Sequence, residues 1–157
     1  MTARATVDNI KNGSYPVART FLIATRGEPD GLVKDFIDFM LSSEGQAVRK
    51  NRRRGLFVGH AMMEKLQEAY LAINPSVIIE IQMSDSASGM MSAIDGTCDI
   101  GMSSRDLHDA EKERLRSAAI ALDRIAIIVH PDNPLTELTR GQVGAIFTGE
   151  AERRPRK

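Results

Sequence analysis

The fold is decided by residues 82–105, which read QMSDSASGMMSAIDGTCDIGMSSR. The spacing predicts an extended segment, a Ser/Gly turn, a short helix over Ser88–Ile94, a strand over Asp99–Met102 and a second turn at Ser103–Arg105. The first N–H groups of a helix have no partner within the helix, and the helix dipole places partial positive charge there. The stretch therefore gathers hydroxyls and amides where an anion can bind.

Five residues of this stretch are candidate oxyanion ligands: Ser86, Ser88, Gly89, Ser104 and Arg105. The serines offer hydroxyls, the glycine admits a close approach of the backbone, and the arginine carries a planar fork of donors that fits a tetrahedral oxyanion. Each also has a purely structural interpretation. The serines are equally typical of a helix N-cap, and the arginine can pair with Asp106 or Asp123.

Elsewhere, apolar runs predict strands and apolar residues at helical spacing predict helices. The expected strands are Arg19–Thr25, Leu56–Val58, Val77–Ile81 and Ile125–Val129. The expected helices are 30–42, Ser43–Asn51 with Ser43 as N-cap, Ala61–Ile73, Asp109–Ser117, and one through Phe147 that Thr139 caps and Gly149 ends. This alternation predicts an α/β domain, a three-layer α/β/α sandwich with a mostly parallel sheet. Both Ser turns follow strands directly, so we expect them to share one crevice at the carboxyl ends of the strands.

The composition suits one globular domain. The chain has 157 residues, 42% of them hydrophobic and 27% charged, with a formal net charge of +0. Basic runs occur at Arg49–Arg54 and in the tail 150–157, but no aromatic residues accompany the first run for stacking on bases, so no nucleic-acid partner is expected.

No cofactor or metal is expected. Cys98 is the only cysteine, which rules out an internal disulfide. The three histidines, His60, His108 and His130, lie far apart without metal-ligand spacing. The first six residues do not resemble a secretory signal, which predicts a cytoplasmic location for the chain as expressed.

Residues 60–149 resemble the first lobe of a phosphate-binding protein of the ABC phosphate uptake system, a type II periplasmic binding protein. The resemblance rests on Glu64-Lys65-Leu66, Ala69-Tyr70, Asn74-Pro75, the Ser86–Gly89 turn, Asp95-Gly96-Thr97, Asp99–Arg105, Ala121-Leu122-Asp123, Ile125–Val129, Asn133-Pro134, Leu138-Thr139 and Ile146–Gly149. It implies that Ser86, Ser88, Gly89, Ser104 and Arg105 bind phosphate, and that the parent family docks on a membrane permease from the periplasm or from an extracellular membrane anchor.

Residues 6–58 resemble the C-terminal part of the same family, through Asn12–Arg19, Gly31–Phe39 and Leu41–Gln46. The family's tail thus precedes its head, and residues 1–157 are interpreted as a single lobe in circularly permuted order. The rearrangement is interpreted as engineered, with a natural origin left open. The family's opening Gly-Ser-Thr-type loop is missing, and Arg54–His60 occupies its place.

The resemblance implies a non-catalytic oxyanion-binding module, weakened because a receptor of this kind closes two lobes on its ligand. The alternative is an engineered or rearranged domain that self-associates, as a homodimer through an exposed interlobe face, and binds no ligand. An enzyme with Ser86 or Ser104 as nucleophile and His60 or His130 as base is disfavoured, because nothing in the sequence fixes their mutual geometry.

Overall fold

β1, Ala18–Arg26, is the strand that the apolar run predicts, and both of its faces are covered. The structure, a computed structural model, describes residues 18–50, 58–124, 130, 132–133 and 138–150. It divides into two units, 20–123 and a second made of 1–19 and 124–157, which are described separately. The predicted strand Ile125–Val129 and residues 56–57 of the predicted strand Leu56–Val58 lie outside the described residues. Val58 is the first residue of a helix, so the strand prediction is wrong at that position.

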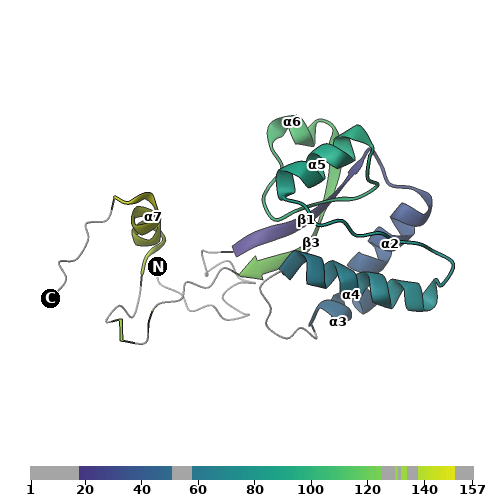
Figure 1. Cartoon of the computed structure of the whole chain (residues 1–157), viewed down its shortest axis with the longest axis horizontal. Helices are drawn as coiled ribbons and strands as arrows, with labels where there is room; N and C mark the ends of the chain where they lie inside the picture. Colours follow the sequence, from purple (N-terminus) through teal and green to yellow (C-terminus); the bar gives the residue numbers. More distant parts are fainter. Residues whose placement is uncertain (1–17, 51–57, 125–129, 131, 134–137, 151–157) are drawn as a thin grey trace. The chain divides into compact units, whose positions relative to one another are not determined.

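Alternate residues of β1 point into two different cores, as the period of a strand requires. Phe21 and Ile23 belong to one buried cluster, in which they are 8% and 1% exposed. Leu22 and Ala24 belong to the other. The sheet therefore separates two layers of helices, which confirms the α/β class (Figure 1).

The first layer consists of α2, Gly31–Leu41, α3, Ser43–Lys50, and α4, Val58–Ile73. Met40 and Leu66 are fully buried in it, and the ring of Tyr70 packs against Phe36 and Phe39 at centroid distances of 5.0 and 5.4 Å. The start of α3 differs slightly from expectation. The hydroxyl of Ser42 accepts a hydrogen bond from the Gly45 amide at 3.2 Å, so Ser42 caps the helix in place of Ser43.

The second layer consists of α5, Ser86–Asp95, and the short helix α6, Asp109–Lys112. Met90 and Ala93 of α5 are fully buried against Ala24. Gly96 ends α5 in the left-handed conformation with φ 75°, as the sequence predicts.

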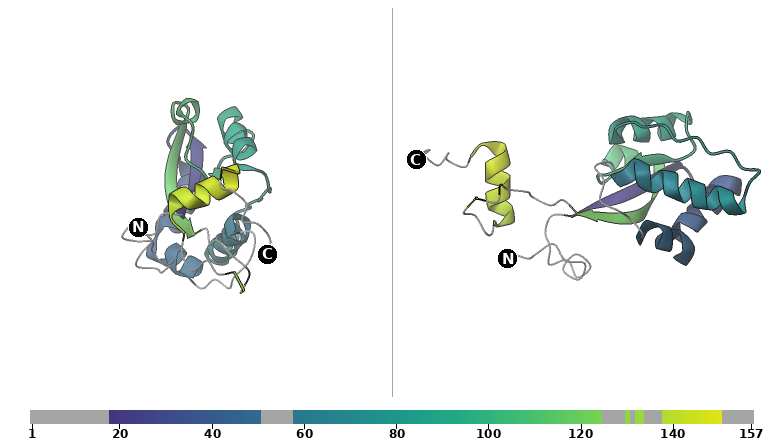
Figure 2. Two further views of the ribbon diagram at one scale, coloured as in Figure 1. Left: turned by 90° about the vertical axis from the view of Figure 1, so that its left-hand side faces the viewer. Right: turned by 60° about the horizontal axis from the view of Figure 1, so that its bottom comes forward.

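The described sheet has the strand order β2-β1-β3, with β2 over Gly101–Ser103 and β3 over Leu115–Arg124. β1 pairs antiparallel with β2, and Leu22 lies opposite Ser103. β3 lies alongside β1 and runs in the opposite direction (Figures 1 and 2). The expected mostly parallel sheet is therefore wrong for these strands. Alternation of strands with helices predicts the layers, but a connection as long as the one from β1 to β2 allows the chain to return in either direction.

Two predicted elements also differ. Val77–Ile81 is extended but pairs with no described strand. Its side chains still alternate, with Val77, Ile79 and Ile81 against the first core and Ile78 87% exposed. The predicted helix Asp109–Ser117 is helical only in its first turn, because Leu115 and Ile120 are buried in the two cores as parts of β3.

In the other unit, α7 spans Arg140–Thr148. Thr139 accepts a hydrogen bond from the Gln142 amide at 3.2 Å, and Gly149 ends the helix with φ 79°, so both predicted caps are confirmed. None of the helices in the described part of the chain has the length and apolar character needed to cross a membrane.

Candidate functional site

The N-terminus of α5 is capped by the chain's own carboxylate. Asp85 accepts hydrogen bonds from the amides of Ala87 and Ser88 at 2.8 and 2.9 Å, and from the Ser88 hydroxyl at 3.0 Å. The hydrogen bonds from Ser88 and then from Ala87 lower the pKa of Asp85. The groups of Ser88 that the sequence assigns to an anion are therefore engaged by Asp85, and Ser86 opens the helix as its first residue.

Ser86 meets the turn after β2. Its hydroxyl accepts a hydrogen bond from the Ser104 amide at 3.1 Å, and the two hydroxyl oxygens lie 3.5 Å apart. The two Ser turns thus lie side by side, as the sequence predicts.

Two glycines allow this approach of α5 to β2. A Cβ added at Gly101 would lie 2.6 Å from the carbonyl oxygen of Gly89, closer than real Cβ atoms come. A Cβ added at Gly89 would lie 3.0 Å from the carbonyl oxygen of Met102. Gly89 therefore serves the packing of the helix against the strand, and its amide donates within the first turn to the Asp85 carbonyl at 2.9 Å.

Arg105 forms an ion pair that the sequence did not predict. Its guanidinium donates to both carboxylate oxygens of Glu111, each at 2.8 Å, and to the carbonyl of Asp106 at 2.9 Å. The pair raises the pKa of Arg105 and lowers the pKa of Glu111 to about 2. Glu111 also accepts from the His108 amide at 2.8 Å, so the pair is tied to the start of α6. The sequence analysis named Asp106 and Asp123 as possible partners of Arg105. Asp106 accepts a hydrogen bond from Arg105 only through its backbone carbonyl, and the side chain of Asp123 is not among those that the structure describes.

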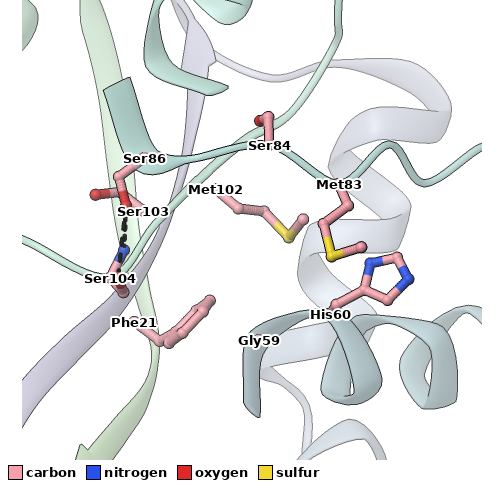
Figure 3. A pocket seen from close by; sticks show the side chains of 9 residues that line it. All are labelled: Phe21, Gly59, His60, Met83, Ser84, Ser86, Met102, Ser103 and Ser104. Atoms are coloured by element: carbon pink, nitrogen blue, oxygen red, sulfur yellow. Dashed lines mark hydrogen bonds between the residues drawn. The ribbon is translucent and has the colours of Figure 1, made fainter. Parts of the chain in front are cut away.

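A hollow of about 100 Å³ adjoins the Ser86–Ser104 contact. It is lined by Phe21, Gly59, His60, Met83, Ser84, Ser86, Met102, Ser103 and Ser104. Figure 3 shows the serines Ser86, Ser103 and Ser104 at one end, His60 at the other, and the side chains of Met102 and Met83 between them.

His60, which the sequence analysis weighed only as a disfavoured catalytic base beside Ser86 or Ser104, also lines this hollow. Its Nε2 lies 3.3 Å from Oε1 of Glu64, one turn along α4. Its Nδ1 is buried and has no hydrogen-bond partner among the described residues. Spacing could not reveal this side chain, because α4 reaches the serines only through the tertiary fold. Within the described ranges, no three His, Cys, Asp or Glu side chains gather as metal ligands.

Comparison with known proteins places this geometry in a family. Residues 58–154 match the model of a PBP superfamily domain. The chain belongs to the PBP superfamily. The match includes α4, α5, β2 and every residue of the hollow except Phe21.

Relatives of this PBP-superfamily chain include named phosphate-binding proteins. It is 40% identical over 169 residues to "Phosphate-binding protein PstS 2" of Streptococcus agalactiae serotype V, covering 93% of this chain and 58% of that protein. It is 32% identical to the protein of that name in Streptococcus pneumoniae serotype 4, covering 94% and 58%. A crystal structure of a phosphate ABC transporter phosphate-binding protein from S. pneumoniae TIGR4 superposes with a TM-score of 0.80 at 32% identity, covering 95% of this chain and 66% of that one.

The chain spans 58% of the length of these two streptococcal relatives. The alignment with the S. agalactiae protein has 169 positions and covers 93% of the 157 residues. It therefore leaves gaps in this chain, which lacks residues that the relative has within the matched region.

Proposed function

We propose that this chain is a non-catalytic oxyanion-binding module, with phosphate as the ligand, and that the anion binds where the Ser86 and Ser104 hydroxyls meet. The observation that carries the proposal is the 3.5 Å approach of these hydroxyls, contributed by two different elements of the fold. Hydroxyl groups donate well to phosphate oxygens. The names of the streptococcal relatives support phosphate as the ligand.

Two internal carboxylates argue for weak binding. Asp85 occupies the first amides of α5, and Glu111 occupies the guanidinium of Arg105. An arriving anion meets the negative charge of Asp85 beside Ser86, and it recruits Arg105 only by breaking a bidentate pair. We therefore expect a dissociation constant above the micromolar range for the chain on its own. Ser88, Gly89 and Arg105 remain part of the proposal as groups that a bound anion could engage after such a rearrangement.

Isothermal titration calorimetry with inorganic phosphate tests the proposal. Ser86→Ala and Ser104→Ala should each weaken binding about fivefold, the effect of one hydrogen bond of about 1 kcal/mol. Ser117→Ala, an exposed serine on β3, is the matched control and should leave the affinity unchanged. Unchanged affinity in both site variants, or no binding heat at millimolar phosphate, would contradict the proposal. A submicromolar dissociation constant would contradict the expectation that the chain binds phosphate weakly.

Self-association is the second candidate function, favoured by apolar side chains on the extended segment before α5. Ile78 is 87% exposed and Met83 is 69% exposed. A chain that gives no heat with phosphate, and whose light-scattering mass rises with concentration, would favour this alternative.

The circularly permuted order remains a proposal that rests on two resemblances, of residues 6–58 to the family's C-terminal part and of residues 60–149 to its first lobe. A sequence alignment keeps the order of residues, and one alignment covers 93% of this chain, which argues against a different order in that streptococcal relative. The structural relative is a phosphate-binding protein of a phosphate ABC transporter, which supports docking of the intact parent protein on a membrane permease.

A further inference from the structure

Residues 77–83, the unpaired segment, have the side-chain pattern of a sheet strand without a strand beside them. Their inward side chains Val77, Ile79 and Ile81 pack against the first core. After Val77, the backbone of this segment forms no hydrogen bond with another backbone group in the described part of the chain, and the Ile79 carbonyl accepts from the side chain of Gln67. Extended backbone with open donors and acceptors is a template on which a further strand can pair.

β2 has an open edge as well. It lies at the end of the order β2-β1-β3, so within the described sheet it pairs with β1 on one edge and with no strand on the other. Met102 of β2 packs against the same core as the unpaired segment. Both stretches therefore cover the same layer of helices, and both have open backbone groups.

The two stretches are neighbours and run in the same direction. A Cβ placed on Gly89 of α5 would lie 3.6 Å from Oγ of Ser84 and 3.0 Å from the carbonyl oxygen of Met102. The unpaired segment leads into the first Ser turn and β2 leads into the second, and these turns meet where the Ser104 amide donates to the Ser86 hydroxyl. Two stretches that end at the same edge are parallel to each other.

The hollow lies between these two stretches. Met83 and Ser84 line it from the unpaired segment, and Met102 and Ser103 line it from β2. Figure 3 shows the side chains of Met83 and Met102 reaching towards one another. Methionine side chains are unbranched and flexible, so they fill gaps and can rotate out of them. The hollow thus marks a position in the sheet at which one strand is missing.

The streptococcal relatives have residues that could fill this position. Their two alignments have 169 positions each and cover 93% and 94% of the 157 residues, so this chain lacks more residues than the five or so that form an ordinary strand. The S. pneumoniae crystal structure still superposes on 95% of this chain with a TM-score of 0.80. This supports a loss of residues that left the arrangement of the remaining elements unchanged.

We propose that the space between the unpaired segment and β2 accepts one extended strand from another polypeptide, parallel to both. The partner has apolar side chains at alternate positions, which cover Phe21 and the rest of the first core, and its backbone pairs along both edges. This inference goes beyond the proposed function and holds whether or not phosphate binds.

Hydrogen–deuterium exchange of the full chain with a synthetic peptide tests the proposal. The peptide has the sequence of the longest run of residues in the S. agalactiae protein that has no counterpart in this chain. At saturation it should slow the exchange of amides in residues 78–83 and in β2 at least about tenfold, and leave α7 unchanged. A peptide with the same residues in scrambled order is the control and should protect neither stretch.

Two N-methylated forms of the peptide locate the strand. Methylation of every second amide blocks one edge, because successive amides of a strand point to opposite sides. A strand between two neighbours uses both edges, so both forms should bind at least about tenfold more weakly than the parent peptide. If one form binds as tightly as the parent, the peptide pairs on a single edge and the proposal is overturned.

Three other results would also overturn the proposal. These are no protection at millimolar peptide, equal protection by the scrambled peptide, and residues 78–83 that are protected without peptide as the protein concentration rises, which would assign the position to a second copy of this chain. The phosphate titration of the chain without peptide decides the proposed function separately.

Discussion

At the scale of single residues, the Arg105–Glu111 ion pair makes the free energy of unfolding depend on pH. Glu111 is 14% exposed and Arg105 is 30% exposed, so solvent screens their pair less than a surface ion pair. The pKa of Glu111 is lowered from 4.5 to about 2 in the folded chain. A lowered pKa means that the stabilisation is fully present above pH 4.5 and is lost as the pH falls towards 2.

We predict that Glu111→Gln lowers the free energy of unfolding by about 1–2 kcal/mol at pH 7. Near pH 2, where Glu111 of the wild type is protonated in large part, most of this difference between variant and wild type should disappear. Urea unfolding at a series of pH values measures this. Asp109→Asn is the control, because Asp109 pairs with Lys112 on the same short helix but its side chain is 96% exposed. If the unfolding free energies of wild type and Glu111→Gln changed equally with pH, the Arg105–Glu111 pair would contribute nothing to stability.

The prediction that the two Ser turns lie together was right, because the Ser86 hydroxyl accepts a hydrogen bond from the Ser104 amide. The sequence did not predict Glu111 as the partner of Arg105. Glu111 is held by its hydrogen bond from the His108 amide at the start of α6, and the first residue of a one-turn helix cannot be predicted reliably from sequence. The burial of Nδ1 of His60 could not be predicted, because it depends on the tertiary fold.

At the scale of elements, the contact between α5 and β2 depends on two glycines. A side chain at Gly101 would meet the backbone of Gly89 at 2.6 Å, and a backbone cannot rotate away as a side-chain end can. We predict that Gly101→Ala destabilises the chain by about 1–3 kcal/mol, the usual cost of overpacking. It should also separate Ser86 from Ser104 and weaken phosphate binding more than Ser117→Ala does.

Chemical denaturation and the phosphate titration measure both effects. Gly144→Ala on α7 is the matched control, because a Cβ there meets nothing within 4 Å and alanine favours a helix. If Gly101→Ala were as stable as wild type, the close packing of α5 on β2 would be wrong.

Element types were predictable where apolar residues at helical spacing ran over a long segment, as in α2 and α4, or where caps marked both ends, as in α7. The prediction of element type failed where contacts with distant parts of the chain determine the backbone conformation. Val77–Ile81 has the composition and alternation of a strand, but a strand also needs a neighbour to receive its hydrogen bonds. Leu115–Arg124 begins inside a run of charges at helical spacing, and burial in the two cores decides its conformation.

At the scale of the whole molecule, the unit 20–123 has two cores that share one sheet. Leu66 is fully buried in the first core, and Met90 of α5 belongs to the second. We predict that Leu66→Ala costs about 2–5 kcal/mol and raises the exchange rate of amides in α5 as much as in α4, because the sheet couples the two layers.

Hydrogen–deuterium exchange read by mass spectrometry measures this coupling. Ile78→Ala removes a side chain that is 87% exposed and should change stability by no more than about 0.5 kcal/mol. Faster exchange confined to α4 in Leu66→Ala would show that the layers unfold independently. The layered architecture itself was predictable from the alternation of elements, whereas strand direction was not, because no local signal encodes it.

The pairing of β1 with β2 also has a consequence for synthesis on the ribosome. Leu22 leaves the exit tunnel long before its partner Ser103 is translated. Until then Phe21 and Ile23 lack the neighbouring strand β2, and before residues 58–73 are translated they also lack α4, so nascent chains expose an unpaired strand edge to one another. Ribosomes pausing anywhere between these two residues would hold the chain in its most aggregation-prone form, and chaperones that shield nascent strands would be needed most over that interval.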